Sequence, residues 1–131
     1  MRIMIFENDA VSAEYLSQLL RRQGHRVFMA KDGGNTAEQL RRNPADLVIT
    51  DIFLANISGL QVVLDVKGCS PGTKVLAVSG GGNTLNFDYL DYALEFGADA
   101  VLRKPLDESS LLSVLKTFTP GGEVHEQRAT A

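Results

Sequence analysis

The sequence alternates between short apolar runs and stretches with helical periodicity, and this alternation limits the fold more than any other feature. Each apolar run has the length of a strand and is followed by polar or glycine residues that predict a turn. The predicted strands are Arg2–Phe6, His25–Ala30, Leu47–Ile49, Lys74–Val78 and Asp99–Leu102. Strands that alternate with helices indicate a parallel sheet covered on both faces, because parallel strands need long crossover connections.

Helical periodicity fills the segments between the predicted strands. The predicted helices run from Ala10 to before Gly24, from Asn35 to before Pro44, and over about 60–67, 85–96 and 108–118. Asp9 and Asp107 are the expected N-caps of the first and last helix. For five such units the strand order 2-1-3-4-5 of a flavodoxin-like three-layer α/β sandwich is a common solution, and we predict that fold.

Composition fits one cytoplasmic domain. A chain of 131 residues suits a single hydrophobic core. We expect this domain over residues 1–119 and a disordered tail over 120–131, where apolar residues are almost absent. The net charge of -3 gives no electrostatic reason to expect nucleic acid or a membrane surface as a partner. Cys69 is the only cysteine, which fits a reducing compartment, and no apolar stretch is long enough to span a bilayer.

Polar residues follow four of the predicted strands at the ends where open α/β sheets bind their ligands. Glu7 and Asn8 follow the first strand, and Asp51 ends the third after Thr50. Ser79 closes the fourth strand and Lys104 follows the fifth. The predicted strand order brings all of these residues to one edge of the sheet, so we expect one cleft with acids, a hydroxyl and a lysine. An aspartate at a strand end is by itself most often a cap, and its neighbours favour a functional role here.

In this arrangement the sequence resembles the receiver domain of two-component response regulators, over about residues 2 to 118. The motifs that carry the resemblance are Glu7-Asn8-Asp9, the run Ala45–Asp51, Gly59, Ser79 and Lys104-Pro105. The resemblance implies that Asp51 accepts a phosphoryl group from a phosphohistidine on a sensor histidine kinase or phosphotransfer protein. It implies a signalling phosphoacceptor rather than an enzyme, beyond its own phosphorylation and dephosphorylation.

The same resemblance implies a role for each neighbour of Asp51. Glu7, Asn8, Asp51 and the backbone carbonyl of Phe53 would bind Mg²⁺ (or Mn²⁺), a hard cation that neutralises the two anionic reactants. Lys104 would bind a phosphoryl oxygen as a compact charge. Ser79 would hydrogen-bond the phosphoryl group and convert its presence into a loop movement.

The sequence departs from the family pattern at three places. Asn8 stands where the family usually carries an acid, so we expect the metal to bind more weakly. Val101 stands three residues before the lysine, where the family usually has an aromatic ring. Leu54-Ala55 replaces the commoner Met-Pro, and glycines lengthen the loop after Ser79.

The predicted fourth helix indicates where a downstream partner could bind. We expect Leu90, Ala93 and Leu94 to form its buried stripe, with aromatic residues on a different face. These aromatic residues are Tyr89, Tyr92 and Phe96. They could anchor a downstream protein on the surface made by the fourth helix, fifth strand and fifth helix, which the family uses for partners, or they could pack inside the domain.

Two functions stay open at the level of sequence. One is a phosphorylatable response regulator, and the other is a phosphorylation-independent receiver-like module that binds partners in a fixed state. Asn8 and Val101 favour the second. An acid phosphatase is a weaker third reading, because its second carboxylate would stand where Phe53 is. Whether the protein forms a homodimer is also left open.

Overall fold

The computed structural model describes residues 1–30, 33–54, 57–80, 83–84 and 87–118. A five-stranded parallel sheet forms its centre, in the order β2-β1-β3-β4-β7. Its strands are β1 (Arg2–Phe6), β2 (Arg26–Met29), β3 (Leu47–Asp51), β4 (Lys74–Ser79) and β7 (Ala100–Arg103). Because β7 is the fifth strand of this sheet in sequence, the order is 2-1-3-4-5, as the sequence predicts.

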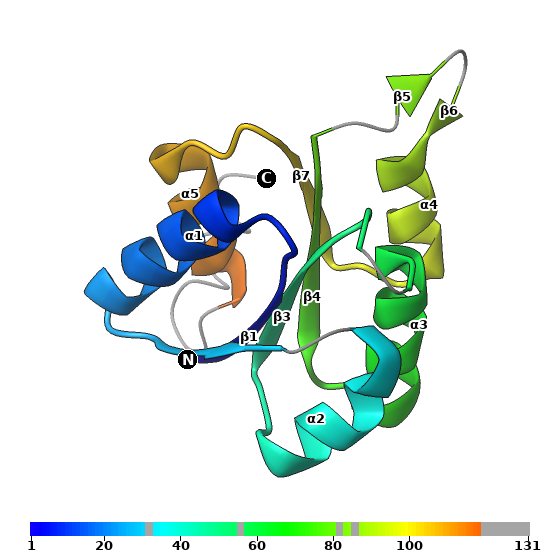
Figure 1. Cartoon of the computed structure of the whole chain (residues 1–131), viewed down its shortest axis with the longest axis horizontal. Coiled ribbons are helices and arrows are strands. Elements are labelled where there is room, and N and C mark those ends of the chain that lie inside the picture. The colour runs from blue at the N-terminus through cyan, green and yellow to red at the C-terminus, as the bar shows by residue number, and fades with distance from the viewer. Residues whose placement is uncertain (31–32, 55–56, 81–82, 85–86, 119–131) are drawn as a thin grey trace.

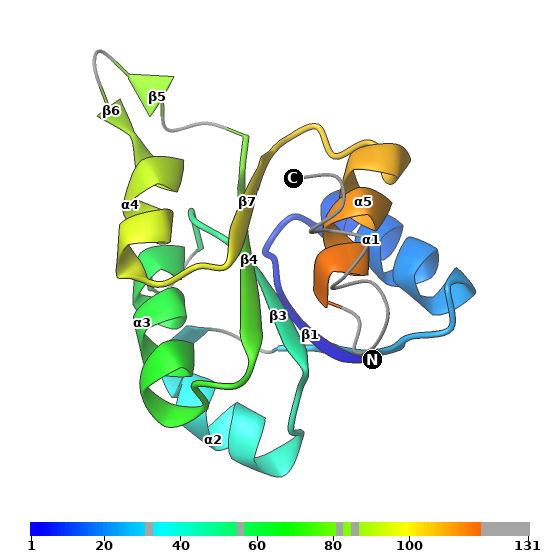
Figure 2. The same ribbon diagram turned by 180° about the vertical axis from the view of Figure 1, so that it is seen from behind.

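Helices cover both faces of the sheet (Figures 1 and 2). One layer contains α1 (Ala10–Arg22) and α5 (Glu108–Phe118), and the opposite layer contains α2 (Thr36–Arg42), α3 (Gly59–Cys69) and α4 (Tyr89–Phe96). A short 3-10 helix, Gly33–Asn35, precedes α2. The three-layer α/β sandwich expected from the alternating sequence is therefore confirmed.

Alternate side chains of the strands enter two separate hydrophobic cores. Along β3, Leu47 and Ile49 pack with α1 and α5, whereas Val48 packs with α2, α3 and α4. All three side chains have no exposed surface. Strands buried on both faces need the continuous apolar runs that the sequence shows, since neither face of such a strand meets water.

Side-chain N-caps define the first turns of α1 and α5, the helices that follow β1 and β7. The side chain of Asp9 accepts a hydrogen bond from the backbone N–H of Ser12 at 2.8 Å, and that of Asp107 accepts one from Ser110 at 2.7 Å. These two predicted N-caps are confirmed, whereas Asn35, where a capping box with Glu38 was also expected, makes no side-chain hydrogen bond that caps α2. After α1, Gly24 has a φ of 91°, the left-handed conformation that a glycine adopts most easily beyond a helix end.

The segment before α4 differs from the prediction. Of the helix expected over 85–96, the part from Tyr89 to Phe96 forms α4, residues 87–88 form a strand, and residues 85–86 lie outside the described ranges. Two short antiparallel strands precede α4, β5 (Asn83–Thr84) and β6 (Phe87–Asp88). Figures 1 and 2 both show this hairpin outside the helix layers, beyond the first turn of α4. The third helix also differs, since it continues to Cys69 beyond its predicted end.

The predicted stripe of α4 is correct at two of its three positions. Leu90 and Ala93 are buried, but the side chain of Leu94 is 48% exposed. Tyr89 and Phe96 pack partly against the core instead, because they share the face of Ala93 at spacings of four and three residues. Of the three aromatic residues, Tyr92 is the exposed one.

Some expectations fall on residues outside the described part of the chain. They concern the tail after residue 119, Ala55, and two glycines of the loop after Ser79, Gly81 and Gly82. The boundary between a domain over 1–119 and a tail stays a prediction. Within the described ranges, no helix combines the length and the apolar character that crossing a membrane would require.

Candidate functional site

Strand register brings the predicted site residues to one edge of the sheet. Asp51 is the last residue of β3 and pairs with Val78, the residue before Ser79. On the other side of β3, Thr50 pairs with Phe6, the residue before Glu7. The backbone N–H of Lys104 donates to the carbonyl of Ser79 at 3.0 Å. Glu7, Asp51, Ser79 and Lys104 therefore come together as the sequence predicts, from the ends of four neighbouring strands.

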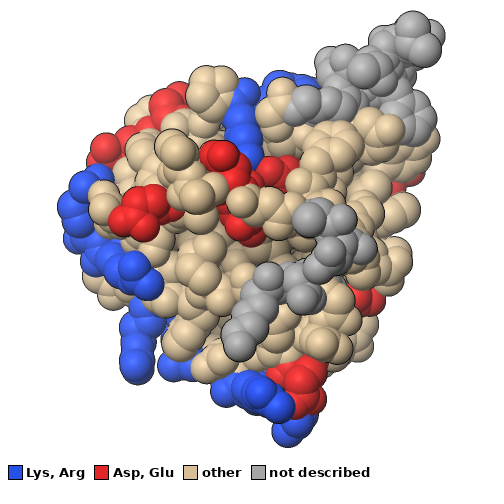
Figure 3. All heavy atoms as spheres, in the orientation of Figure 1, with Lys and Arg blue, Asp and Glu red and all other residues tan. Residues whose placement is uncertain are grey.

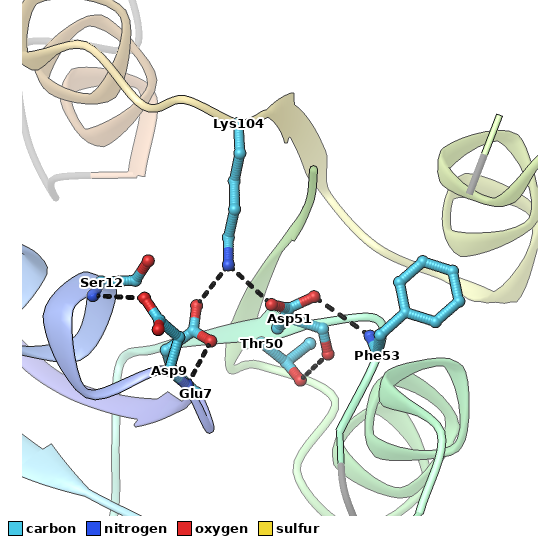
Figure 4. Close-up of polar contacts among 7 residues, drawn as sticks. All are labelled: Glu7, Asp9, Ser12, Thr50, Asp51, Phe53 and Lys104. Atoms are coloured by element: carbon cyan, nitrogen blue, oxygen red, sulfur yellow. Dashed lines mark hydrogen bonds and ion pairs between the residues drawn. The ribbon is translucent and has the colours of Figure 1, made fainter. Parts of the chain in front are cut away.

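Lys104 lies between the two carboxylates of this cleft (Figure 4). Its ammonium nitrogen lies 2.7 Å from Oδ2 of Asp51 and 2.8 Å from Oε1 of Glu7. The acids are well covered, with exposed side-chain fractions of 10% for Asp51 and 2% for Glu7. The single positive charge of Lys104 offsets one of the two negative charges, and each covered carboxylate gains an ion-pair partner.

The remaining carboxylate oxygens accept backbone hydrogen bonds. Oδ1 of Asp51 accepts from the N–H of Phe53 at 3.0 Å, and Oε2 of Glu7 accepts from the N–H of Asp9 at 3.0 Å. In each acid, therefore, one carboxylate oxygen pairs with Lys104 and the other accepts a hydrogen bond from a backbone N–H two residues later in the chain. This double attachment fixes the direction in which each carboxylate points.

Two opposing effects act on the pKa of Lys104. Burial lowers the pKa, but hydrogen bonds to Asp51 and Glu7, together with their charges, outweigh burial and raise it above its usual value. The side chain is therefore a full cation at neutral pH. A fixed cation beside Asp51 can attract the oxygens of an incoming anionic group.

A tight backbone contact holds the end of β3 against α3. Ser58 caps α3 by accepting a hydrogen bond from the N–H of Leu60 at 3.1 Å. The N–H of Gly59 donates to the carbonyl of Ile52 at 2.7 Å. A Cβ atom at Gly59 would overlap the carbonyl oxygen of Asp51 and lie 2.6 Å from Cα of Ile52. Only glycine fits here, which gives a physical reason for the Gly59 motif.

Asn8 directly follows Glu7 at the end of β1. It is exposed and lines a groove together with Phe53 and Tyr89. Among the described residues, no three His, Cys, Asp or Glu side chains are grouped so that they could hold a metal ion. Asn8 is thus accessible at the groove that Phe53 also lines, two residues after Asp51.

The donors at this edge fit a hard cation. They are oxygens of Glu7 and Asp51, and the ammonium of Lys104 already lies between them as a positive charge would. Figure 3 shows acidic side chains gathered near the ends of β1 and β3 on this face, while basic side chains lie mostly along its left and lower margins. This field attracts cations to the cleft.

Three features of the site could not be predicted from the sequence. Lys104 was expected to contact a phosphoryl group, and its bridge between Glu7 and Asp51 emerges only in three dimensions. The packing of Gly59 on Asp51 is likewise a tertiary contact. The third feature is an edge-to-face pair of Phe53 with Tyr89 of α4, their ring centroids 5.2 Å apart. No local sequence pattern indicates such a pair.

Comparison with known proteins agrees with this geometry. Residues 3–116 match the family model of the response regulator receiver domain. The chain belongs to this family. The transcriptional regulatory protein DltR of Streptococcus agalactiae serotype III is 30% identical over 119 residues, which cover 91% of this chain and 52% of that protein. The chain spans about half the length, or less, of the first curated relatives that it matches.

Solved receiver structures share the fold. A response regulator receiver domain protein from Methanospirillum hungatei JF-1 is 25% identical, with a TM-score of 0.80 over 99% of this chain and 98% of that one. The receiver domain of sensor histidine kinase PA1611 from Pseudomonas aeruginosa PAO1 is 22% identical. Its TM-score is 0.76 over 89% of this chain and 95% of that one, and its structure holds a magnesium ion in the active-site cleft.

Membership of the family sets the general role of the chain. Receiver domains belong to two-component signalling, in which they act as phosphoacceptors and are generally not enzymes. They interact with histidine kinases or phosphotransfer proteins. The roles of individual residues in this receiver are a separate question.

Proposed function

We propose that this receiver accepts a phosphoryl group on Asp51 from a phosphohistidine of a histidine kinase or phosphotransfer protein, and signals through a changed binding surface. The observation that carries the proposal is the geometry of Asp51, a well-covered carboxylate at a strand end with Lys104 at 2.7 Å. In the transfer, an oxygen of Asp51 forms a bond to phosphorus while the P–N bond breaks. The donor imidazole leaves with the electron pair.

Each neighbour has a part in this reaction. The ammonium of Lys104 would bind one oxygen of the incoming phosphoryl group. There it would stabilise the negative charge that develops on this group in the transition state. Ser79 closes β4 beside Lys104 and would donate its hydroxyl to the same group. The N–H of Phe53 holds Oδ1 of Asp51, so the other carboxylate oxygen is directed toward the lysine.

Glu7, Asn8, Asp51 and the carbonyl of Phe53 would hold Mg²⁺ or Mn²⁺. When bound, the metal would neutralise the charges of acceptor and phosphoryl group. The oxygen donors at this edge and the magnesium ion in the PA1611 receiver support this assignment. Asn8 contributes a neutral oxygen where an acid would contribute a charge, so binding would be weaker than in a receiver with two acids.

The phosphodonor must approach Asp51 closely, and one apolar groove lies next to it. Val11, Tyr15, Pro105 and Leu106 line this groove of about 520 Å³ together with Lys104. Val11, in the first turn of α1, is 78% exposed, so it can contact a bound protein. The groove would receive the apolar surface around the donor histidine.

The output surface would lie on α4, β7 and α5. Because Tyr89 and Phe96 pack partly against the core, Tyr92 and Leu94 are the exposed apolar residues that α4 offers to a downstream protein. The charge of -3 supports a protein partner over direct contact with nucleic acid. We place the protein in the cytoplasm, where its proposed phosphodonors act.

Labelling by a small phosphodonor tests the proposal. Incubation with acetyl phosphate and Mg²⁺ should add one phosphoryl mass to the intact chain, and Asp51→Asn should abolish the gain. Asp46→Asn is the matched control. Asp46 lies just before the opposite end of β3 and accepts a hydrogen bond from the N–H of Arg2 at 2.8 Å. Native protein that gains no mass, or labelling that survives in Asp51→Asn, would refute the proposal.

The second candidate is a receiver-like module that binds partners without phosphorylation. It is favoured by the neutral Asn8 and by the aliphatic Val101, which packs partly against one core without supplying a ring. This candidate predicts that partner binding is equal for native protein and Asp51→Asn, with and without phosphodonor. The first candidate predicts that binding changes only when Asp51 is labelled.

A further inference from the structure

Phe53 contacts two different parts of the molecule. Its backbone N–H donates to Oδ1 of Asp51 at 3.0 Å, and its backbone pairs with Ser58 in an isolated antiparallel bridge. Its ring is not part of the cleft. The residue is 49% exposed, and Figure 4 shows the ring pointing away from Asp51. One residue therefore joins the acceptor carboxylate to a surface outside the cleft.

The ring of Phe53 reaches α4. Its centroid lies 5.2 Å from that of Tyr89, and the two planes are inclined by 79°. This edge-to-face arrangement is one of the favoured geometries for two aromatic rings, since the positive edge of one meets the negative face of the other. The contact spans residues that are far apart in sequence and belong to different elements.

Tyr89 is well placed to pass a movement into α4. It is the first residue of the helix and precedes the buried Leu90. A further aromatic contact of this helix joins Tyr92 and Phe96, whose centroids are 6.5 Å apart. Among the ring contacts of the described residues, the pair with Tyr89 is the one that links α4 to the segment after Asp51.

We propose that Phe53 is a positioning residue that couples the chemical state of Asp51 to α4 through the ring of Tyr89. This inference rests on the proposed phosphoacceptor function and adds the route by which phosphorylation reaches the output helix. The route starts at the Asp51–Phe53 hydrogen bond and ends in the first turn of α4.

The physical cause is the change of charge on Asp51. Before phosphorylation, the N–H of Phe53 donates to an oxygen of an anionic carboxylate. After an oxygen of Asp51 has bonded to phosphorus, and the donor has left with the electron pair of its broken bond, the acyl carbon carries no carboxylate charge. A hydrogen bond to a neutral acyl oxygen is weaker than one to a carboxylate. Phe53 then favours a different position, and the ring of Tyr89 responds because the attraction between the two rings weakens when one of them moves away.

Heteronuclear NMR can test the coupling with beryllium trifluoride and Mg²⁺, which together mimic a phosphoryl group on a carboxylate. In the ¹⁵N-labelled chain, the amides of Ile52 and Lys104 report whether the mimic has bound, and those of α4 report the response of the helix. The variants that remove the ring are Tyr89→Leu and Tyr89→Met. Tyr89→Phe keeps the ring, and Tyr92→Leu removes a ring from the same helix outside the proposed route.

The native protein, Tyr89→Phe and Tyr92→Leu should show shift changes in both regions. In Tyr89→Leu and Tyr89→Met the changes at Ile52 and Lys104 should persist, while those in α4 fall by about threefold or more. The coupling would be overturned if the α4 amides of these two variants showed shift changes as large as those of the native protein. It would also be overturned if Tyr92→Leu lost the α4 shift changes to the same extent as Tyr89→Leu. If native protein shows no change even at Ile52 and Lys104, the phosphoacceptor proposal itself fails.

Discussion

Replacing Gly59 by alanine tests how closely α3 is held against the end of β3. The added Cβ would overlap the carbonyl oxygen of Asp51 and lie 2.6 Å from Cα of Ile52 and 2.8 Å from the carbonyl carbon of Asp51. All three contacted atoms belong to the backbone of the acceptor segment, so no side chain can rotate away. Either the first turn of α3 or the end of β3 has to move.

The structure allows the cost to be estimated. Carbon atoms that do not bond are most stable about 3.5–4.0 Å apart, so the backbones must separate by about 1 Å. The movement also disturbs the hydrogen bond from the N–H of Gly59 to Ile52, which is 2.7 Å long. Overpacking costs about 1–3 kcal/mol, and the loss of a buried hydrogen bond costs about 1 kcal/mol more. We expect Gly59→Ala to lower the free energy of unfolding by about 3 kcal/mol, which is about 10 °C in Tm.

Gly68→Ala is the matched control because it lies in the same helix. A Cβ at Gly68 would meet nothing within 4 Å. In a helix interior, glycine lowers the stability by about 0.5–1 kcal/mol relative to alanine, so this variant should be slightly more stable than the native protein. Urea unfolding followed by circular dichroism measures both effects. A Gly59→Ala protein with native stability, or an equal loss in Gly68→Ala, would refute the close contact.

Two further predictions concern charges at the cleft. Asn8→Asp should strengthen Mg²⁺ binding by about tenfold in a calorimetric titration, because it adds a charge near the cation, whereas Asn43→Asp at the far end of α2 should leave the affinity unchanged. Equal affinities in the two variants would contradict the assignment of Asn8. Lys104→Met should lower the free energy of unfolding by roughly 1–3 kcal/mol at neutral pH, since Glu7 and Asp51 lose their shared partner. The pKa of Lys104 is raised in the folded protein, so this contribution is fully present below the usual lysine value of 10.5 and is lost as the pH rises through the raised pKa. The stability difference between native protein and Lys104→Met should therefore shrink above pH 10.5, and a difference that shrinks near pH 7 would contradict this assignment.

The fold could be predicted from the sequence because local and global signals agree. The apolar runs of β1, β3 and β4 are continuous, as burial on both faces requires, and the helix caps Asp9 and Asp107 follow local rules. The site followed from the fold, since parallel strands place their carboxyl ends at one edge.

The errors have a common physical origin. The predicted fourth helix included residues 87–88, yet these residues form β6 and pair with β5. Leu94 was assigned to the core by the helical period, whereas the helix turns Tyr89 and Phe96 inward. A short periodic pattern does not fix the rotation of a helix about its axis, because that rotation depends on the surface on which the helix packs.

The two separate cores have a consequence for how the protein could meet its partners. The groove beside Val11 and Tyr15 lies on the α1 and α5 side of the sheet, whereas α4 lies on the opposite side. Asp51 is at the edge that both sides share. A donor seated in the groove would therefore leave Tyr92 and Leu94 of α4 accessible, whereas α5 is shared by the donor side and the proposed output surface. Substitutions could also alter the specificity for one partner without disturbing the core that supports the other.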